Sequence, residues 1–171
     1  GLSEVVTVTG APRIQLETGA NDQYVSYTDD KLRFKDIDDN IYKAVKIGTQ
    51  YWSTTNLKVT KYRDGTSIPT GYGAAQWTDL TAGAYAKYND NSSNVNTYGN
   101  LYNWYAVNDN RNIAPAGWHV PTDAEWKILT DYLGGTSVAA GKIKETGTTH
   151  WNSPNTGATN ESGFTALPGG S

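Results

Sequence analysis

The sequence predicts an α+β fold, with strands in the first third of the chain and helices in its second half. Two kinds of pattern carry this prediction. Residues 13–17 and 23–27 alternate polar and apolar side chains, which is typical of half-buried strands. Residues 122–133 carry the start signal and the apolar face of an amphipathic helix. At 171 residues, the chain is long enough to bury a core of its own without staples.

The first 34 residues are interpreted as a β-rich amino-terminal extension or assembly strand, and residues 35–171 as the main domain. Residues 4–9 are rich in β-branched side chains, and a Gly-Ala-Pro sequence ends the run, as expected for a strand. This extension is either an appendage or a strand used in assembly.

The main domain begins with a β-meander. Residues 36–40 predict a turn, because Asp and Asn side chains bond their own backbone and tolerate left-handed conformations. Residues 41–47 follow as a strand, and a turn at 48–50 leads into the next one. The Asp-x-Asp-x-Asn spacing at 36–40 also suggests calcium, but the Gly and terminal Glu of a calcium-binding helix–loop–helix are missing.

The remainder of the chain predicts loops and helices. Residues 63–97 are rich in Gly, Asn, Asp and Ser and are interpreted as a surface excursion. A first helix is predicted over 99–108, because Leu101, Trp104 and Tyr105 recur at helical spacing. A third, short helix is predicted over residues 138–144.

The second helix, over residues 122–133, has the clearest local signal. Thr122 and Glu125 have the spacing of a capping box, in which each side chain bonds the other residue's backbone N–H. Trp126, Leu129 and Leu133 share one face, and a Gly-Gly pair ends the helix.

Composition excludes several classes of function. The net charge is −3 and no basic stripe appears, so nucleic acid is not an expected partner. No apolar run approaches the ~20 residues of a membrane-spanning helix. There are no cysteines, which excludes disulfides and thiolate chemistry. The aromatic residues are 6 Trp, 12 Tyr and 2 Phe, so many rings with a polar end are available either for the core or for a half-exposed binding surface.

Blocks at residues 36–42, 45–48, 98–107, 115–126 and 163–170 together resemble the Fibrobacter succinogenes major paralogous domain family, over about residues 36–170. The resemblance implies a C-type-lectin-like fold with mixed or antiparallel sheets and two main helices, distantly similar to formylglycine-generating enzymes. It also implies a bacterial protein that is extracellular or at the cell surface. Formylglycine chemistry needs cysteines, so the resemblance carries the fold and not that activity.

The chain departs from the family pattern in two ways. Ala86 and Ala114 stand where cysteines are common in the family. The family domain usually continues beyond the block at 163–170, whereas this sequence stops at Ser171, so we expect a fragment, a divergent short form or a module completed by another chain. An incomplete sheet would leave an open edge, and open edges recruit strands. We therefore expect residues 1–34, or a neighbouring subunit, to supply a strand by β-augmentation.

Catalytic patterns are absent from the sequence, so we expect a protein that is not an enzyme. The two histidines, His119 and His150, lack zinc-protease spacing, and no Gly-x-Ser-x-Gly elbow occurs. The candidate ligand-binding residues lie in the aromatic and Asn-rich loops: Trp77, Tyr85, Tyr88, His150, Trp151, Asn152, Asn155, Asn160 and Glu161. The oxygen donors at 152–161 suit a calcium ion as cofactor; alternatively, they satisfy their own loop backbone.

The leading interpretation is a secreted or surface module for adhesion or for binding a glycan or a surface protein. The alternative is a structural subunit of an extracellular filament, pilus or phage appendage that self-assembles by strand addition. The two interpretations differ in whether the protein remains a monomer in solution.

Overall fold

In the part of the chain that the structure describes, the main sheet has six antiparallel strands. The computed structural model describes residues 15–16, 26–28 and 31–169, and the strands predicted over 4–9 and over most of 13–17 and 23–27 lie outside these residues. The strand order across the sheet is β2 (Ser26–Thr28), β3 (Lys31–Lys35), β4 (Ile41–Ile47), β5 (Gln50–Ser53), β1 (Gln15–Leu16) and β8 (Trp118–His119).

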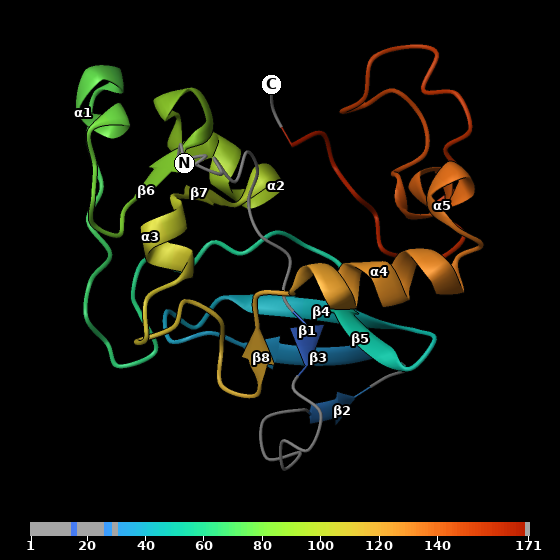
Figure 1. The fold of residues 1–171 in the computed structure, drawn as a ribbon, viewed down its shortest axis with the longest axis horizontal. Coiled ribbons are helices and arrows are strands. Elements are labelled where there is room, and N and C mark those ends of the chain that lie inside the picture. The colour runs from blue at the N-terminus through green and yellow to red at the C-terminus, as the bar shows by residue number, and fades with distance from the viewer. Residues whose placement is uncertain (1–14, 17–25, 29–30, 170–171) are drawn as a thin grey trace, which may run out of the picture.

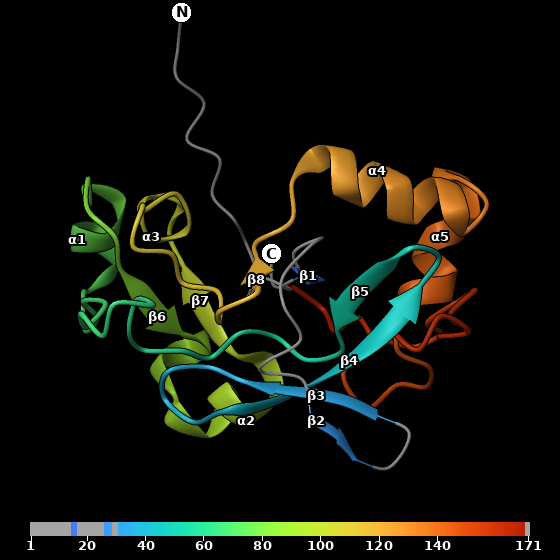
Figure 2. The ribbon, with the colours of Figure 1, turned by 90° about the horizontal axis from the view of Figure 1, so that it is seen from below.

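A second, two-stranded antiparallel sheet and three short helices lie together at one end of the molecule, and the two longer helices lie at the other end (Figures 1 and 2). The first group contains β6 (Tyr85–Lys87), β7 (Asn100–Tyr102), α1 (Ala74–Thr78), α2 (Val95–Tyr98) and α3 (Trp104–Val107). The longer helices are α4 (Asp123–Tyr132) and α5 (Thr136–Ile143), and 3-10 turns at Tyr88–Asp90 and Ser92–Asn94 precede α2. Helices and antiparallel sheets in one chain confirm the predicted α+β class.

The structure confirms α4 and its start signal. The Thr122 backbone N–H donates to Glu125 Oε2 at 2.7 Å, and the Glu125 N–H donates to Thr122 Oγ1 at 3.4 Å, which completes the capping box. Leu129 and Leu133 are buried, and Gly134 takes the positive φ expected just beyond the helix. The predicted short helix at 138–144 corresponds to α5, two residues earlier at its start.

The helix predicted over 99–108 is wrong in extent. Its first part is β7, which pairs with β6, and only α3 is helical. The Asn103 side chain accepts a hydrogen bond from the Ala106 N–H and so begins the helix at Trp104. The predicted apolar face is also wrong, because Trp104 and Tyr105 are 46% and 38% exposed, whereas Tyr102 and Ala106 are buried.

The predicted turn at 36–40 and the strand at 41–47 are confirmed. The Asp36 carboxylate accepts hydrogen bonds from the backbone N–H groups of Asp38 and Asn40, each at 2.9 Å. Asp39 takes a positive φ of 62°, as the Asp/Asn composition indicates. The turn therefore needs no metal ion to explain its sequence.

The interior holds two aromatic-rich clusters. One includes Phe34, Tyr42 and Trp118 from three strands of the main sheet, and the other joins Trp52 on β5 to Leu129 on α4 and Phe164 near the carboxy terminus. In the described residues, no helix has the length and apolarity that crossing a membrane requires.

Candidate functional site

Three rings from two segments that are distant in the sequence form a row at the surface. Tyr88 meets the edge of Tyr98, with ring centroids 5.4 Å apart, and Tyr98 meets the edge of His150, with centroids 5.8 Å apart. Tyr88 and Tyr98 flank the turns before β7, whereas His150 lies in the loop after α5. We call these residues the His150 row. Tyr88 is its most exposed ring, at 42%.

Glu145 fixes the orientation of His150 in this row. The His150 Nδ1 lies 2.8 and 3.0 Å from the two oxygens of the Glu145 carboxylate. An ionised carboxylate only accepts hydrogen bonds, so Nδ1 carries the proton and donates it. In the neutral ring, Nε2 is then an acceptor, able to take a hydrogen bond from a ligand hydroxyl or N–H.

Trp151 follows His150 in the chain and contacts Lys144 and Ala166. Its indole N–H donates to the Ala166 carbonyl at 3.0 Å, and the Lys144 ammonium lies 4.2 Å from the ring centroid. Lys144 and Ala166 also form a parallel β-bridge, so the residues beneath the ring are tied to one another. The half-buried Trp151 ring is held by its polar edge, with a cation on its face.

The Asn side chains of this region mainly hold the loops together. Asn155 donates to the carbonyls of Glu145 and Gly147, at 2.9 and 2.6 Å, and so closes the loop that carries His150. Asn160 accepts from the Thr165 N–H at 2.8 Å, and Asn152 is exposed. Among the described residues, no group of three or more His, Asp or Glu side chains is arranged to hold a metal ion. These contacts fit the alternative in which the loop satisfies its own backbone.

Two of the predicted residues lie elsewhere. Tyr85 is only 8% exposed and packs against Tyr102 in the core, so its ring is not presented to a ligand. Trp77 lies in α1, which Figures 1 and 2 place at the opposite end of the molecule from α5. The aromatic loops therefore do not form one continuous surface.

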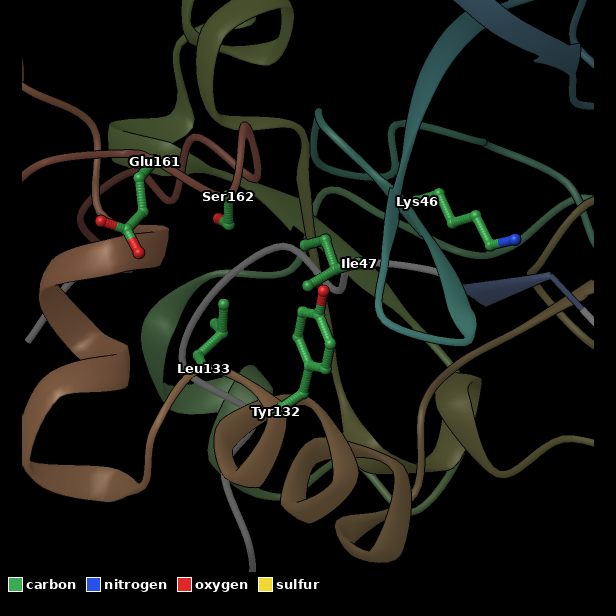
Figure 3. A pocket seen from close by; sticks show the side chains of 6 residues that line it. All are labelled: Lys46, Ile47, Tyr132, Leu133, Glu161 and Ser162. Carbon is green, nitrogen blue, oxygen red and sulfur yellow. The ribbon is translucent and has the colours of Figure 1, made fainter.

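Glu161 lines a separate, open pocket of about 250 Å³ (Figure 3). Its walls come from the β4–β5 hairpin, the carboxy-terminal end of α4 and the loop after α5, through Lys46, Ile47, Tyr132, Leu133, Glu161 and Ser162. Glu161 Oε1 lies 2.9 Å from the Lys142 ammonium, so its carboxylate is held in place by α5.

A comparison with protein families matches residues 45–171 to the family described as the Fibrobacter succinogenes major domain. The chain belongs to this family. The match agrees with the resemblance in the sequence blocks and contains the His150 row and the residues that line the pocket. Of the main sheet, β1, β2 and β3 lie before the match. Two further comparisons, one with curated proteins and one with solved structures, gave no match.

Sequence reasoning missed several residues of the His150 row and of the pocket beside Glu161. Tyr98, the last residue of α2, joins Tyr88 to His150, and no sequence pattern linked it to either ring. Glu145 lies close enough to His150 in sequence to pair with it, and a carboxylate five residues before a histidine was the available signal. Tyr132 was outside the predicted apolar face of its helix, and a large aromatic residue on the outer face was the available signal for a surface role.

Proposed function

We propose that this chain is a non-enzymatic secreted or cell-surface module that adheres to or binds a ligand, a glycan or a surface protein, from a C-type-lectin-like scaffold. The His150 row carries the proposal, because it joins rings from two segments that are distant in the sequence. Rings with a polar end suit ligands that offer both apolar faces and hydroxyl groups. The acceptor Nε2 of His150 adds a directed polar contact beside them.

The test is binding of the full chain to an array of defined neutral and acidic oligosaccharides, with extracellular-matrix proteins as a second arm. Tyr88→Ala and His150→Ala should each reduce binding to the best ligand about tenfold, the loss of roughly 1.4 kcal/mol. Tyr105→Ala is the matched control, because Tyr105 is similarly exposed and also meets a neighbouring ring edge-on at 5.4 Å.

Three outcomes contradict parts of this proposal. Equal losses of binding in Tyr88→Ala and Tyr105→Ala would show that the His150 row is not the binding site. Absence of binding to both the oligosaccharides and the matrix proteins would contradict the proposed binding function. Turnover of glycoside or peptide substrates above blank would show an enzyme.

One observation favours a second candidate function, a subunit of an extracellular filament assembled by strand addition. β1 lies between β5 and β8, with Gln15 opposite Trp52 on one side and His119 on the other. Both flanking strands belong to the matched family domain, whereas β1 precedes it. The domain thus accepts a strand from outside itself, and a second copy offers the same strand.

Disulfide crosslinking between two introduced cysteines tests this second candidate, because the chain has no cysteine of its own. Gln15→Cys and His119→Cys are made as separate proteins, mixed and oxidised, since opposed strand residues meet the Cα separation of a disulfide. A crosslinked heterodimer on a non-reducing gel is expected. The control mixture is Lys46→Cys with Tyr51→Cys, opposed within the β4–β5 hairpin. Equal crosslinking in both mixtures, or none in the first, would overturn strand exchange.

A further inference from the structure

The pocket beside Glu161 has an unusually placed ring in its wall. Tyr132 is 65% exposed, although it ends a helix whose other face is buried. Its ring rises from α4 toward Ile47 (Figure 3). An exposed tyrosine held at the rim of a pocket is a common feature of binding surfaces, because the ring is large, rigid and amphipathic.

Gly48 lets this ring approach the β4–β5 turn closely. The β4–β5 hairpin turns at Gly48 and Thr49, and Gly48 takes a φ of +61°. A turn of this kind by itself favours glycine at its first central position. The Tyr132 ring adds a second requirement, because a Cβ at Gly48 would come within 2.9 Å of its Cδ2 atom. One side of the ring therefore packs on bare backbone, while much of the ring stays open to solvent.

The polar wall of the pocket is formed by Glu161 and Ser162. Glu161 offers carboxylate oxygens, and its charge is offset by the Lys142 ammonium 2.9 Å away. The Ser162 hydroxyl donates to the Lys142 carbonyl at 2.9 Å, so it is fixed beside Glu161. Lys46 extends away from the other five side chains, toward the ring of Tyr51 (Figure 3). The Glu161 carboxylate and the Ser162 hydroxyl oxygen are thus the acceptors of the pocket, and the charge of Glu161 is paired with that of Lys142.

Size narrows the class of ligand. The cavity of about 250 Å³ is smaller than the ~300–1,000 Å³ of sites for drug-sized molecules. An exposed ring on one side and fixed oxygens on the other match a small saturated ring with one apolar face and hydroxyls around its edge.

We propose that this pocket binds a single neutral pyranose unit. The C–H face of the sugar packs on the Tyr132 ring, whose negative π face attracts the weakly positive hydrogens. Sugar hydroxyls donate to the Glu161 carboxylate, with Ser162 Oγ as a further acceptor. The site is separate from the His150 row, so either can fail without the other.

The test is a titration of the isotope-labelled full chain with neutral methyl pyranosides of gluco, galacto, manno and xylo configuration, followed by amide NMR. Glucuronate and glucosamine are the charged comparators. We expect at least one neutral pyranoside to saturate in the millimolar range and to shift the amides of Gly48, Leu133 and Ser162. Small ligands with few contacts bind this weakly.

Single substitutions test whether Tyr132 and Glu161 contact the sugar. Tyr132→Ala and Glu161→Ala should each weaken the best pyranoside about tenfold, whereas Tyr132→Phe, which keeps the ring, should stay within about twofold of the parent. Tyr105→Ala should bind like the parent, because Tyr105 lies in α3, at the other end of the molecule from α5. A thermal unfolding scan confirms that each variant is folded.

Three results would overturn the proposal. One is that no neutral pyranoside shifts these amides. Another is that Tyr132→Ala and Glu161→Ala both bind like the parent. The last is that a charged comparator binds better than every neutral sugar. Loss of array binding in Tyr88→Ala with the pyranose site intact would show that the two sites are distinct.

Discussion

The ring of Phe34 stacks on that of Trp118, with centroids 3.8 Å apart and 21° between the ring planes. Phe34 comes from β3 and Trp118 from β8, which are not neighbours in the strand order, so the sheet must curve to bring them together. Tyr42 stacks on the same phenyl ring at 5.2 Å. Phe34 and Tyr42 both precede the family match, yet they fill the core of the matched domain.

Phe34→Ala should therefore destabilise the whole protein. Removing a buried phenylalanine costs about 3–5 kcal/mol, from lost burial and the cavity that remains. Urea unfolding of the full chain gives the free energy directly. The control is Ile128→Ala, at a half-exposed position on α4, where we expect a change within about 0.5 kcal/mol. A loss below about 1 kcal/mol for Phe34→Ala would contradict a core role for this ring.

Asp36 and Tyr42 form a buried pair that should be coupled energetically. The Tyr42 hydroxyl donates to Asp36 Oδ2 at 2.6 Å, and the same carboxylate holds the turn at Asp38 and Asn40. A double-mutant cycle with Asp36→Ala and Tyr42→Phe should give a coupling free energy of about 1.5–3 kcal/mol, the range for hydrogen bonds to charged groups. Additive effects of the two substitutions would mean that the hydrogen bond contributes nothing to stability.

Sequence reasoning succeeded where the determining contacts are local. The capping box of α4 needs only Thr122 and Glu125, three residues apart, and the turn after β3 needs only Asp36 and its next few neighbours. The family assignment also rested on short ordered blocks. In the cap and in the turn, the hydrogen bonds join residues within one turn of chain, so their residue types appear together in the sequence.

Sequence reasoning failed where pairing between distant segments overrides local periodicity. Leu101, Trp104 and Tyr105 have helical spacing, but pairing with β6 extends the chain through Tyr102. The His150 row depends on Tyr98 lying beside a loop about fifty residues later, and no spacing rule encodes that contact. Tyr85 was predicted from its loop-rich surroundings, and only the tertiary structure shows that Tyr102 covers it.

Gly48→Ala should lower the free energy of unfolding, measured in urea, partly because of the contact with Tyr132. Alanine at φ +61° costs about 1–2 kcal/mol from backbone strain alone, and the collision with the ring adds to that loss. Gly71→Ala is the matched control, because Gly71 has a φ of +88° but no atom within 4 Å of a built Cβ. In a Tyr132→Ala background, Gly48→Ala should cost no more than Gly71→Ala. An unchanged cost in that background would show that the ring does not press on Gly48.

Glu125 should make stability depend on pH in acid. Burial alone would raise the pKa of Glu125, but hydrogen bonds from Thr122 and His119 outweigh it and hold that pKa below its ordinary value. The unfolded chain therefore binds a proton at Glu125 more readily than the folded protein does. This contribution to stability is complete above the unfolded pKa, about 4.3, and is lost as the pH falls through the lower, folded pKa.

The measurement is the difference in unfolding free energy between the parent and Glu125→Gln, which keeps a capping side chain without the charge. This difference should be largest at pH 7 and should shrink steadily as the pH falls below the unfolded pKa. His119→Ala removes one of the hydrogen bonds that lower the folded pKa, so in that background the loss should be smaller and should be complete at a higher pH. A parent–variant difference that is the same at pH 7 and in acid would mean that Glu125 is not held in its charged form by the cap.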